Sequence, residues 1–375
     1  MKYFFLILFT GLACVSRAQT PVPAQLPPAP IQTSYGVLQF DKHFYDVENH
    51  WVVATKIPNN GKYVFGMVYL DMQAGFSFRS EGTFNVDAQG HVYRDSVDYP
   101  KNNIMIARIG ANANPQLAAI PDAMLNDLHV KPVPDWLAAY HPANQDRNSV
   151  AFKVAYGRHL NSSGAAAKAV TYLEEAYKTE PHAAGVEYEL AYAYNIIGQY
   201  DKAIEILKAA KANAPDNPVF YTELAFAYMR KKDYANSVET FKAALPLAKR
   251  DAVTKTTITT NLSLIYCELQ QYDKAHALIS DFIADNPNNI TAYILEATVY
   301  TKENDFDGVI KSYSKAIDVT PPQNMENKAE LALTVAVIYR DKKNDHDQFV
   351  SWAQKARAWA PVNGRAALSL KQLGF

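Results

Sequence analysis

The residues able to do metal or acid–base chemistry are few in this sequence. His43 and His50, with Asp41 and Asp46 nearby, offer nitrogen and carboxylate ligands. Their spacing matches no metal-ligand pattern, such as two histidines one helical turn apart. We therefore interpret them as residues of a solvated loop, and we expect no metal site and no cofactor.

The candidates for acid–base or nucleophilic catalysis are equally weak. Glu174 and Glu175 are adjacent on a predicted helix, so they point in different directions and belong to a solvated face. Cys267 follows Tyr266 on another predicted helix and is interpreted as a small packing residue. The sequence contains no phosphate-binding glycine loop, nucleophile elbow or helical pair of zinc histidines. It therefore predicts a non-enzymatic protein.

The composition excludes a bulk electrostatic role. The 375 residues include 37 basic and 38 acidic side chains, so no net field attracts nucleic acid or an anionic membrane surface. The basic run Arg230-Lys231-Lys232 is too short for nucleic-acid binding by itself. With 49% hydrophobic residues the chain can bury a core, and its length indicates two or three structural units.

The first residues are typical of a bacterial export signal. Lys2 precedes an apolar run that ends at Val15, and small residues surround Ala18, so we expect a signal peptide over 1–18, cleaved after Ala18, and a periplasmic or secreted protein. No apolar stretch reaches the roughly 20 residues of a membrane span. Cys14 leaves a lipid tether open as an alternative, although Gly11 stands where lipoprotein signals usually have Leu.

A β-rich domain over 34–131 follows a proline-rich linker over 19–33. Its runs of β-branched and aromatic residues predict antiparallel strands, because Asn59-Asn60-Gly61 and Asp87-Ala88-Gln89-Gly90 supply turn residues between them. The expected strands are 51–55, 63–70, 75–79, 82–86, 91–93 and 104–109. A short helix is expected to begin at Pro121 and end at Leu128, and a second linker spans 132–149. We recognise no family in this domain, so a glycan-binding or small enzymatic activity there stays an alternative.

A period of 34 residues begins near residue 150. The clearest copy spans 184–217 and carries Leu190, Ala191, Tyr194, Tyr200, Ala203, Leu207, Ala210 and Pro215. Further copies are placed at 150–183, 218–251, 256–289, 290–323 and 329–363. Four residues are inserted before the fourth copy, and the sixth copy slips by one residue. A terminal capping helix follows.

This pattern resembles the tetratricopeptide-repeat (TPR) family, whose repeats place aromatic, small and proline residues at fixed spacings. The expected fold is therefore α+β: a small antiparallel β-rich domain followed by an all-α superhelix of about six helix-turn-helix repeats. In each repeat, small residues such as Ala225 are expected where backbones approach closely.

The resemblance implies that the first helix of each repeat lines a concave groove that receives a peptide or protein partner. The groove positions carried over to this chain include Arg158, Tyr188, Tyr192, Asn195, Phe226, Met229, Arg230, Glu268 and Lys302. Chaperone-binding members clamp a terminal carboxylate with Lys, Asn and Arg, whereas Val154, Arg158 and Glu189 occupy the matching positions here, so we expect no such clamp.

Two interpretations of the groove aromatics remain. Tyr188, Tyr192 and Phe226 form either a binding hot spot or part of the packing between helices. For the whole protein, the sequence favours an interaction scaffold of the bacterial cell envelope, with an envelope-assembly TPR lipoprotein as the alternative. It does not indicate the oligomeric state.

Overall fold

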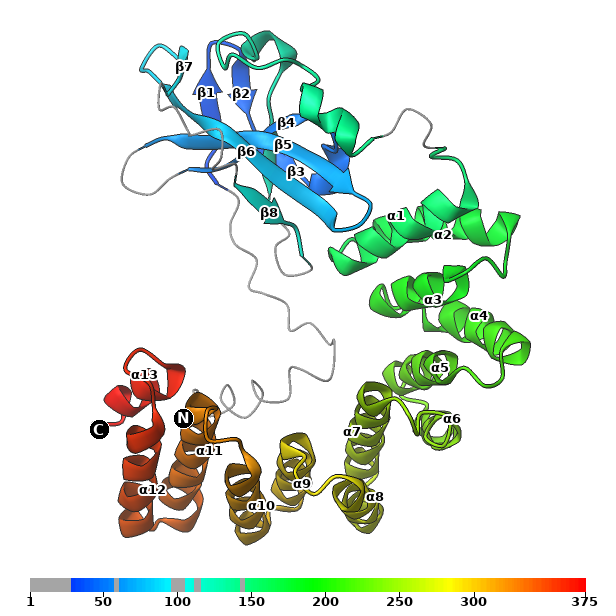
Figure 1. The fold of residues 1–375 in the computed structure, drawn as a ribbon, viewed down its shortest axis with the longest axis vertical. Coiled ribbons are helices and arrows are strands. Elements are labelled where there is room, and N and C mark those ends of the chain that lie inside the picture. Colours follow the sequence, from blue (N-terminus) through cyan, green and yellow to red (C-terminus); the bar gives the residue numbers. More distant parts are fainter. Residues whose placement is uncertain (1–27, 57–60, 96–104, 111–115, 142–145) are drawn as a thin grey trace. The chain divides into compact units, whose positions relative to one another are not determined.

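The computed structural model describes residues 28–56, 61–95, 105–110, 116–141 and 146–375 (Figure 1). The predicted signal peptide, Cys14 and most of the first linker lie outside these residues. The chain divides into two compact units, residues 19–215 and 216–375. The first unit contains both the β-rich segment and the first four helices.

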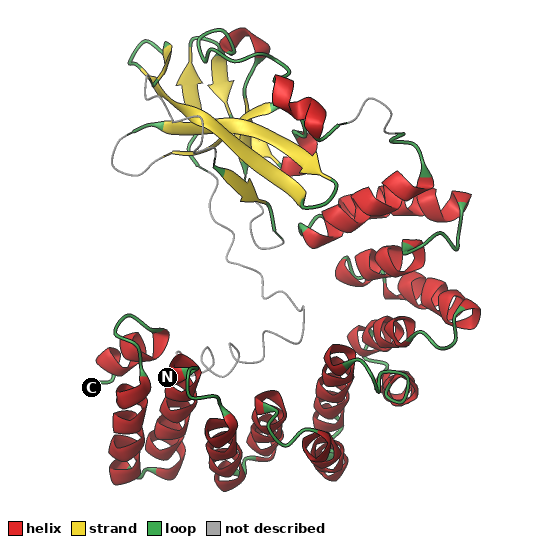
Figure 2. Cartoon of the chain, viewed as in Figure 1, coloured by secondary structure: helices red, strands yellow, loops and turns green. Residues whose placement is uncertain are grey.

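The β-rich segment forms a two-stranded hairpin and a seven-stranded antiparallel sheet (Figure 2). The hairpin pairs β1 (Ile31–Thr33) with β2 (Gly36–Leu38). The sheet has the order β3-β9-β4-β5-β6-β7, and β8 also pairs with β6. Its strands are β3 (Phe40–Lys42), β4 (Trp51–Lys56), β5 (Tyr63–Asp71), β6 (Gly75–Val86), β7 (Val92–Arg94), β8 (Ile106–Arg108) and β9 (Leu117–Ala119).

One long strand replaces two expected ones. The runs 75–79 and 82–86 are joined in β6. All nine residues of β5 pair with this strand. Phe65 lies opposite Gly82 and Gly66 lies opposite Ser80, so Glu81 is the extra residue of a β-bulge. The polar residues between the two runs are thus a bulge within one strand.

Two other local expectations need correction. Ile31 is buried in the sheet's core, so residues 31–33 pair as a strand instead of continuing the proline-rich linker. The segment after Pro121 forms only the 3₁₀ helix η2 (Asp122–Met124), followed by turns. Met124, Leu125 and Leu128 are all buried in the same core.

The two faces of the sheet are covered by different segments of the first unit. On one face Phe65, Met67 and Tyr69 pack against the residues that follow β9, including the 3₁₀ helix η3 (Asp135–Ala139), which lies within the expected second linker. On the other face Phe76 contacts Tyr156 of the first helix, with 5.7 Å between ring centroids.

The remainder of the described chain is helical. The first unit contains α1 (Val150–Ser162), α2 (Ala166–Thr179), α3 (Val186–Ile196) and α4 (Tyr200–Asn213). The second contains α5 (Pro218–Arg230), α6 (Tyr234–Ala244), α7 (Ala252–Glu268), α8 (Tyr272–Asp285), α9 (Ile290–Glu303), α10 (Phe306–Val319), α11 (Met325–Ile338), α12 (His346–Trp359) and α13 (Arg365–Gln372). An antiparallel sheet followed by paired helices confirms the expected fold class.

The first five helical hairpins close through the same turn. A residue with left-handed backbone angles ends the first helix, and the next residue donates its backbone N–H to a carbonyl five residues back. The left-handed residues are Gly164, Gly198, Lys232, Gln270 and Asn304. The accepting carbonyls belong to Leu160, Tyr194, Tyr228, Tyr266 and Tyr300, so the tyrosines of the period mark the hairpin turns.

The two irregularities of the period have structural causes. The second helices of the third and fourth hairpins start at Tyr234 and Tyr272, 38 residues apart, which agrees with an insertion of four residues. In the sixth hairpin the π-helical turn η4 (Tyr339–Lys343) follows α11, and the closing bond runs from Asp345 to Tyr339 across six residues. A π-helical turn contains one additional residue, which explains the slip.

None of the helices in the described residues combines the length and apolar content that a membrane span requires.

Candidate binding surface on the first helices of the hairpins

An ion pair and an amide join α1 to α3 in the first unit. The Nε of Arg158 donates to Oε1 of Glu189 at 2.9 Å, and the Nδ2 of Asn161 donates to Oε2 of the same carboxylate at 2.9 Å. The Glu189 side chain is 9% exposed, whereas that of Arg158 is 55% exposed. Arg158 therefore presents a guanidinium whose charge is already neutralised by its neighbour.

Two tyrosines lie one turn apart on α3. The rings of Tyr188 and Tyr192 are stacked, with 6.3 Å between their centroids and 26° between their planes. Both side chains are only half-buried, so part of each ring is exposed to solvent. Asn195, the third groove position on this helix, is buried, with 4% exposure. The exposed part of the face is thus aromatic.

In the second unit the corresponding face of α5 is apolar. Phe226 is half-buried and packs edge-on against Phe241 of α6, at 5.5 Å between centroids and 90° between planes. Met229 is half-buried against the same core, and Arg230 is exposed in the last turn. Phe226 therefore packs within the hairpin and keeps part of its surface exposed, and the hot-spot interpretation stays a prediction.

A salt bridge connects the ends of α7 and α9. The Nζ of Lys302 lies 3.2 Å from Oε1 of Glu268, and both side chains are about half exposed, at 50% and 54%. The two residues are 34 positions apart in the sequence, so they occupy equivalent places in successive hairpins. Their pairing leaves a neutral surface at this point.

The comparison with protein families identifies these hairpins. A family model described as "Tetratricopeptide repeat" matches residues 160–221 and 198–254. Residues 160–254 therefore resemble tetratricopeptide repeats in sequence. The matched residues cover α2 to α6 together with their connections and parts of the flanking segments, and the fourth and fifth hairpins beyond them close through the same turn.

Several solved structures resemble the chain in part. MamA from Desulfovibrio magneticus RS-1 is 18% identical, with a TM-score of 0.36 over 46% of this chain and 93% of MamA. A tetratricopeptide repeat protein from Parabacteroides merdae ATCC 43184 is 13% identical, with a TM-score of 0.39 over 61% and 99%. Pseudomonas aeruginosa PilF is 16% identical, with a TM-score of 0.41 over 60% and 97%.

Among curated proteins, none is similar in sequence to this chain.

Small residues sit where the TPR pattern places them. Ala203, Ala225 and Ala275 have no exposed surface. Ser237, which stands where the family has Ala, is also fully buried and donates its hydroxyl to the backbone carbonyl of Ala225 at 2.8 Å. This bond satisfies the hydroxyl within the helix contact, so the departure from the pattern leaves no unpaired buried donor.

The residues weighed for catalysis occupy ordinary structural places. Cys267 is buried, and burial raises the pKa of its thiol to about 11, so the thiolate form that attacks electrophiles is scarce at neutral pH. Glu175 pairs with Lys153 at 2.8 Å. His43 stacks on Tyr45. Within the described residues, no group of three or more His, Cys, Asp or Glu side chains is arranged to hold a metal ion.

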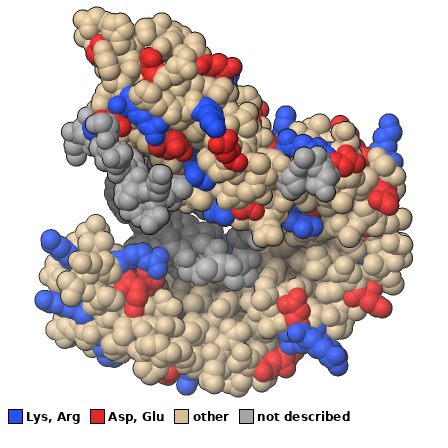
Figure 3. Space-filling model, turned by 45° about the horizontal axis from the view of Figure 1, so that its top comes forward, with Lys and Arg blue, Asp and Glu red and all other residues tan. Residues whose placement is uncertain are grey.

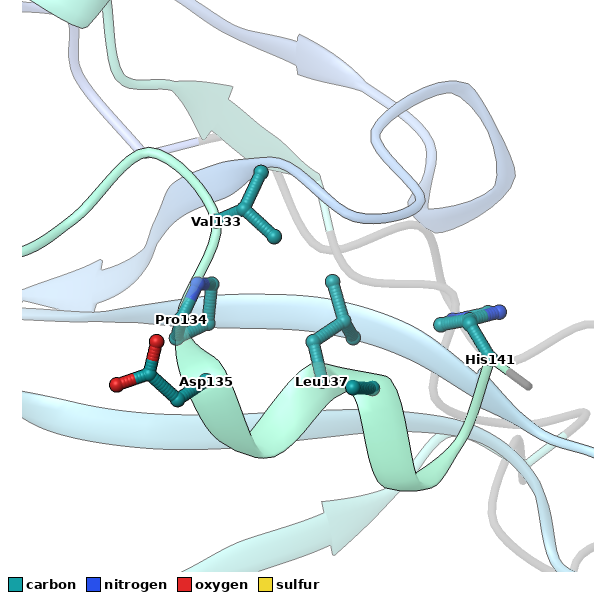
Figure 4. Close-up of a pocket in the computed structure, with 6 residues that line it drawn as sticks. Val133, Pro134, Asp135, Leu137 and His141 are labelled. Atoms are coloured by element: carbon teal, nitrogen blue, oxygen red, sulfur yellow. The ribbon is translucent and has the colours of Figure 1, made fainter. Parts of the chain in front are cut away.

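A pocket of about 470 Å³ lies beside η3 in the first unit (Figure 4). Its lining is mostly apolar and includes Val133, Leu137 and His141. The Asp135 carboxylate points away from Leu137 in Figure 4 and pairs with Lys131 at 2.8 Å. Burial lowers the pKa of His141. The buried Nε2 of this residue has no hydrogen-bond partner within the described residues. Nothing in the sequence pattern indicated this pocket.

Basic and acidic side chains are interspersed on the face drawn in Figure 3. This distribution agrees with the near balance of charges in the sequence.

Proposed function

We propose that this protein is a non-enzymatic interaction scaffold that binds a peptide or protein segment on the first helices of its TPRs. The observation that carries the proposal is the set of partly exposed aromatic and apolar side chains on these helices: Tyr188 and Tyr192 on α3, Phe226 and Met229 on α5. Aromatic side chains held in place by packing are typical of binding hot spots, because little conformational entropy is lost when a partner covers them.

The charges on these helices favour a particular kind of contact. Arg158 is paired with Glu189 and Lys302 is paired with Glu268, so neither cation is free to hold a terminal carboxylate without breaking an existing pair. We therefore expect the partner to be recognised mainly through apolar and aromatic side chains, with its polar groups at the rim of the contact.

A pull-down with the purified protein as bait tests this function. The double variant Tyr192→Ala, Phe226→Ala is expected to stay folded and to lose the partner. The control is Tyr93→Ala, which removes an aromatic ring that is 55% exposed on β7, a strand outside the repeat sequence. Equal capture by the double variant and the wild type would reject the proposal. Loss only in the control would favour a binding activity of the β-rich segment.

We also propose that the protein works in the bacterial cell envelope. The support is the sequence of its first residues, in which Lys2, an apolar run and Ala18 follow one another as in an export signal. Mass spectrometry of the mature N-terminus tests the location. A chain that starts at Gln19 fits cleavage after Ala18, and an acylated Cys14 fits the lipoprotein alternative. An intact Met1 in the native host contradicts both.

A further inference from the structure

Arg79 occupies an unusual position on the sheet. It lies on β6, opposite Met67 of β5 and Ile106 of β8, so it shares a face with these residues. Its guanidinium carbon lies 4.2 Å from the centre of the Trp136 ring, which belongs to η3. A guanidinium stacked on an indole is held in one orientation by the attraction between the cation and the ring.

The guanidinium of Arg79 has no acceptor in the described part of the chain. Its Nε is buried and makes no hydrogen bond, and no described carboxylate pairs with it. The side chain as a whole is only half-buried. Buried donors in folded proteins almost always have a partner, so an unpaired one requires an explanation. For a fixed cation at a surface, the simplest explanation is an acceptor that comes from outside the chain.

A second arginine lies nearby on the same face. Tyr69, Ser77 and Arg108 stand opposite one another on β5, β6 and β8. Arg108 donates from Nη1 to the Ser77 hydroxyl and lies 3.3 Å from Asp71 through Nη2, and its side chain is 48% exposed. Arg79 and Arg108 are diagonal neighbours on paired strands, whose spacing is about 7–8 Å. One ligand group can therefore contact both side chains.

We propose that Arg79 and Arg108 form a binding site for an oxyanion, the carboxylate or phosphate group of a ligand. The guanidinium fork of Arg79 offers donors in the planar arrangement that such groups accept. Trp136 fixes the orientation of that fork before the ligand arrives, and the partial exposure of both arginines allows access. This site lies in the β-rich segment and does not depend on the function proposed for the repeats.

The surrounding groups leave the site positively charged. Two arginines face one carboxylate, Asp71, which is already hydrogen-bonded to Arg108. Burial and the neighbouring Tyr140 phenol raise the pKa of Tyr69 to about 12, so Tyr69 is neutral at physiological pH and does not repel an anion. Its ring packs 5.3 Å from Trp136 and thereby supports the platform under Arg79.

Titration of the full chain with inorganic phosphate, and separately with acetate, tests the site and distinguishes the two ligand groups. Ionic strength is held constant with chloride, and the indole N–H signals are followed by NMR, with Trp136 assigned from Trp136→Phe. The expected result is a saturable shift of the Trp136 signal with a dissociation constant on the order of 1 mM, the range of a weak single-group ligand. The signals of the other three tryptophans should not move with it.

Arg79→Gln removes the charge and the fork, and the shift should disappear. The matched control is Arg357→Gln, an exposed arginine on α12, which should leave the shift unchanged. If Arg79→Gln does not fold, Arg79→Lys takes its place, and a dissociation constant at least about tenfold larger is expected because the planar fork is lost. No saturable shift in the wild type below about 100 mM of either anion, or an equal shift in the Arg79 variant, would overturn the proposal.

Discussion

Glu48 joins the sheet to the first repeat through two side chains. Its Oε2 accepts a hydrogen bond from the hydroxyl of Tyr156 at 2.8 Å, and its Oε1 accepts from Arg147. Tyr156 is 4% exposed, and burial followed by the nearby Glu48 charge raises its pKa. The buried phenol therefore acts as a donor to a carboxylate, a bond that contributes more than one between neutral groups.

Tyr156→Phe keeps the ring and removes this bond. We expect it to lower the free energy of unfolding by about 2 kcal/mol, the contribution of a hydrogen bond to a charged group. Urea denaturation followed by circular dichroism provides the measurement.

The control is Tyr172→Phe, because the Tyr172 ring lies 4.6 Å from that of Tyr156 but its hydroxyl has no hydrogen bond to a described residue. The control should change stability by less than about 0.5 kcal/mol. Equal losses in the two variants would show that the Glu48 bond contributes nothing specific.

His141 makes the stability of the first unit depend on pH. Burial lowers the pKa of the His141 imidazole below the ordinary value of 6.5. The positive charge of Arg147 lowers this pKa further, whereas the negative charge of Glu48 raises it. Below pH 6.5 the unfolded chain binds a proton at this residue more readily than the folded chain does, so stability falls as pH decreases.

His141→Gln should reduce the loss of stability between pH 7.5 and pH 5.5, measured by denaturation at both values. The exposed His346 provides the control, since His346→Gln should leave that loss unchanged. A loss of the same size in His141→Gln as in the wild type would contradict the assignment.

At the scale of elements, the hairpin turns carry measurable strain. Lys232 closes the third hairpin with a φ of 64°, a conformation in which its Cβ is crowded by the backbone at a cost of about 1–2 kcal/mol. Lys232→Gly should therefore stabilise the protein by about 1 kcal/mol, as judged from the urea midpoint. Lys232→Ala removes the same charge but keeps Cβ, so it should bring no gain. A gain of equal size in both variants would mean that charge, not backbone strain, is relieved.

Ala225 tests the packing within the second unit. It is fully buried between α5 and α6, where Ser237 bonds to its carbonyl, so Ala225→Phe has no space and should lower stability by about 1–3 kcal/mol. The matched change Ala235→Phe, at an exposed position of α6, should alter it by less than about 0.5 kcal/mol. Thermal melting compares the two. An unchanged melting temperature for Ala225→Phe would show that this position is not a close helix contact.

At the scale of the whole molecule, the repeats could be predicted because their pattern is local. The tyrosines at 194, 228, 266 and 300 mark turns that differ in sequence but share one backbone geometry. The inserted residues before the fourth repeat and the slip in the sixth both appear as shifts in that pattern. The buried alanines follow from the same register.

The β-rich segment was less predictable because its structure depends on distant pairs. The joining of two runs into β6 depends on continuous pairing with β5 across the bulge at Glu81, and the polar residues between the runs do not reveal that pairing. The pairing of β9 with both β3 and β4 links residues more than 60 positions apart. This topology alone brings together Arg79, Trp136 and Arg108. The sequence therefore does not indicate that these residues form a site.

Among the predicted groove residues, the structure differs most from expectation at Asn195. Its amide is buried, whereas Tyr188 and Tyr192 on the same helix keep exposed surface. Periodicity assigns all three to one helix face, but it does not tell how far the neighbouring helices cover that face. Partner binding on this helix is therefore expected to depend on the two tyrosines.

The most direct test is the affinity of the purified partner, once captured, for the wild type and for Tyr192→Ala, Phe226→Ala, measured by isothermal titration calorimetry. If these rings are the anchors, the double variant should bind at least about 100-fold more weakly, because each hot-spot ring contributes about 2 kcal/mol or more. An affinity within about twofold of the wild type, with circular dichroism unchanged, would contradict binding on the first helices of the repeats.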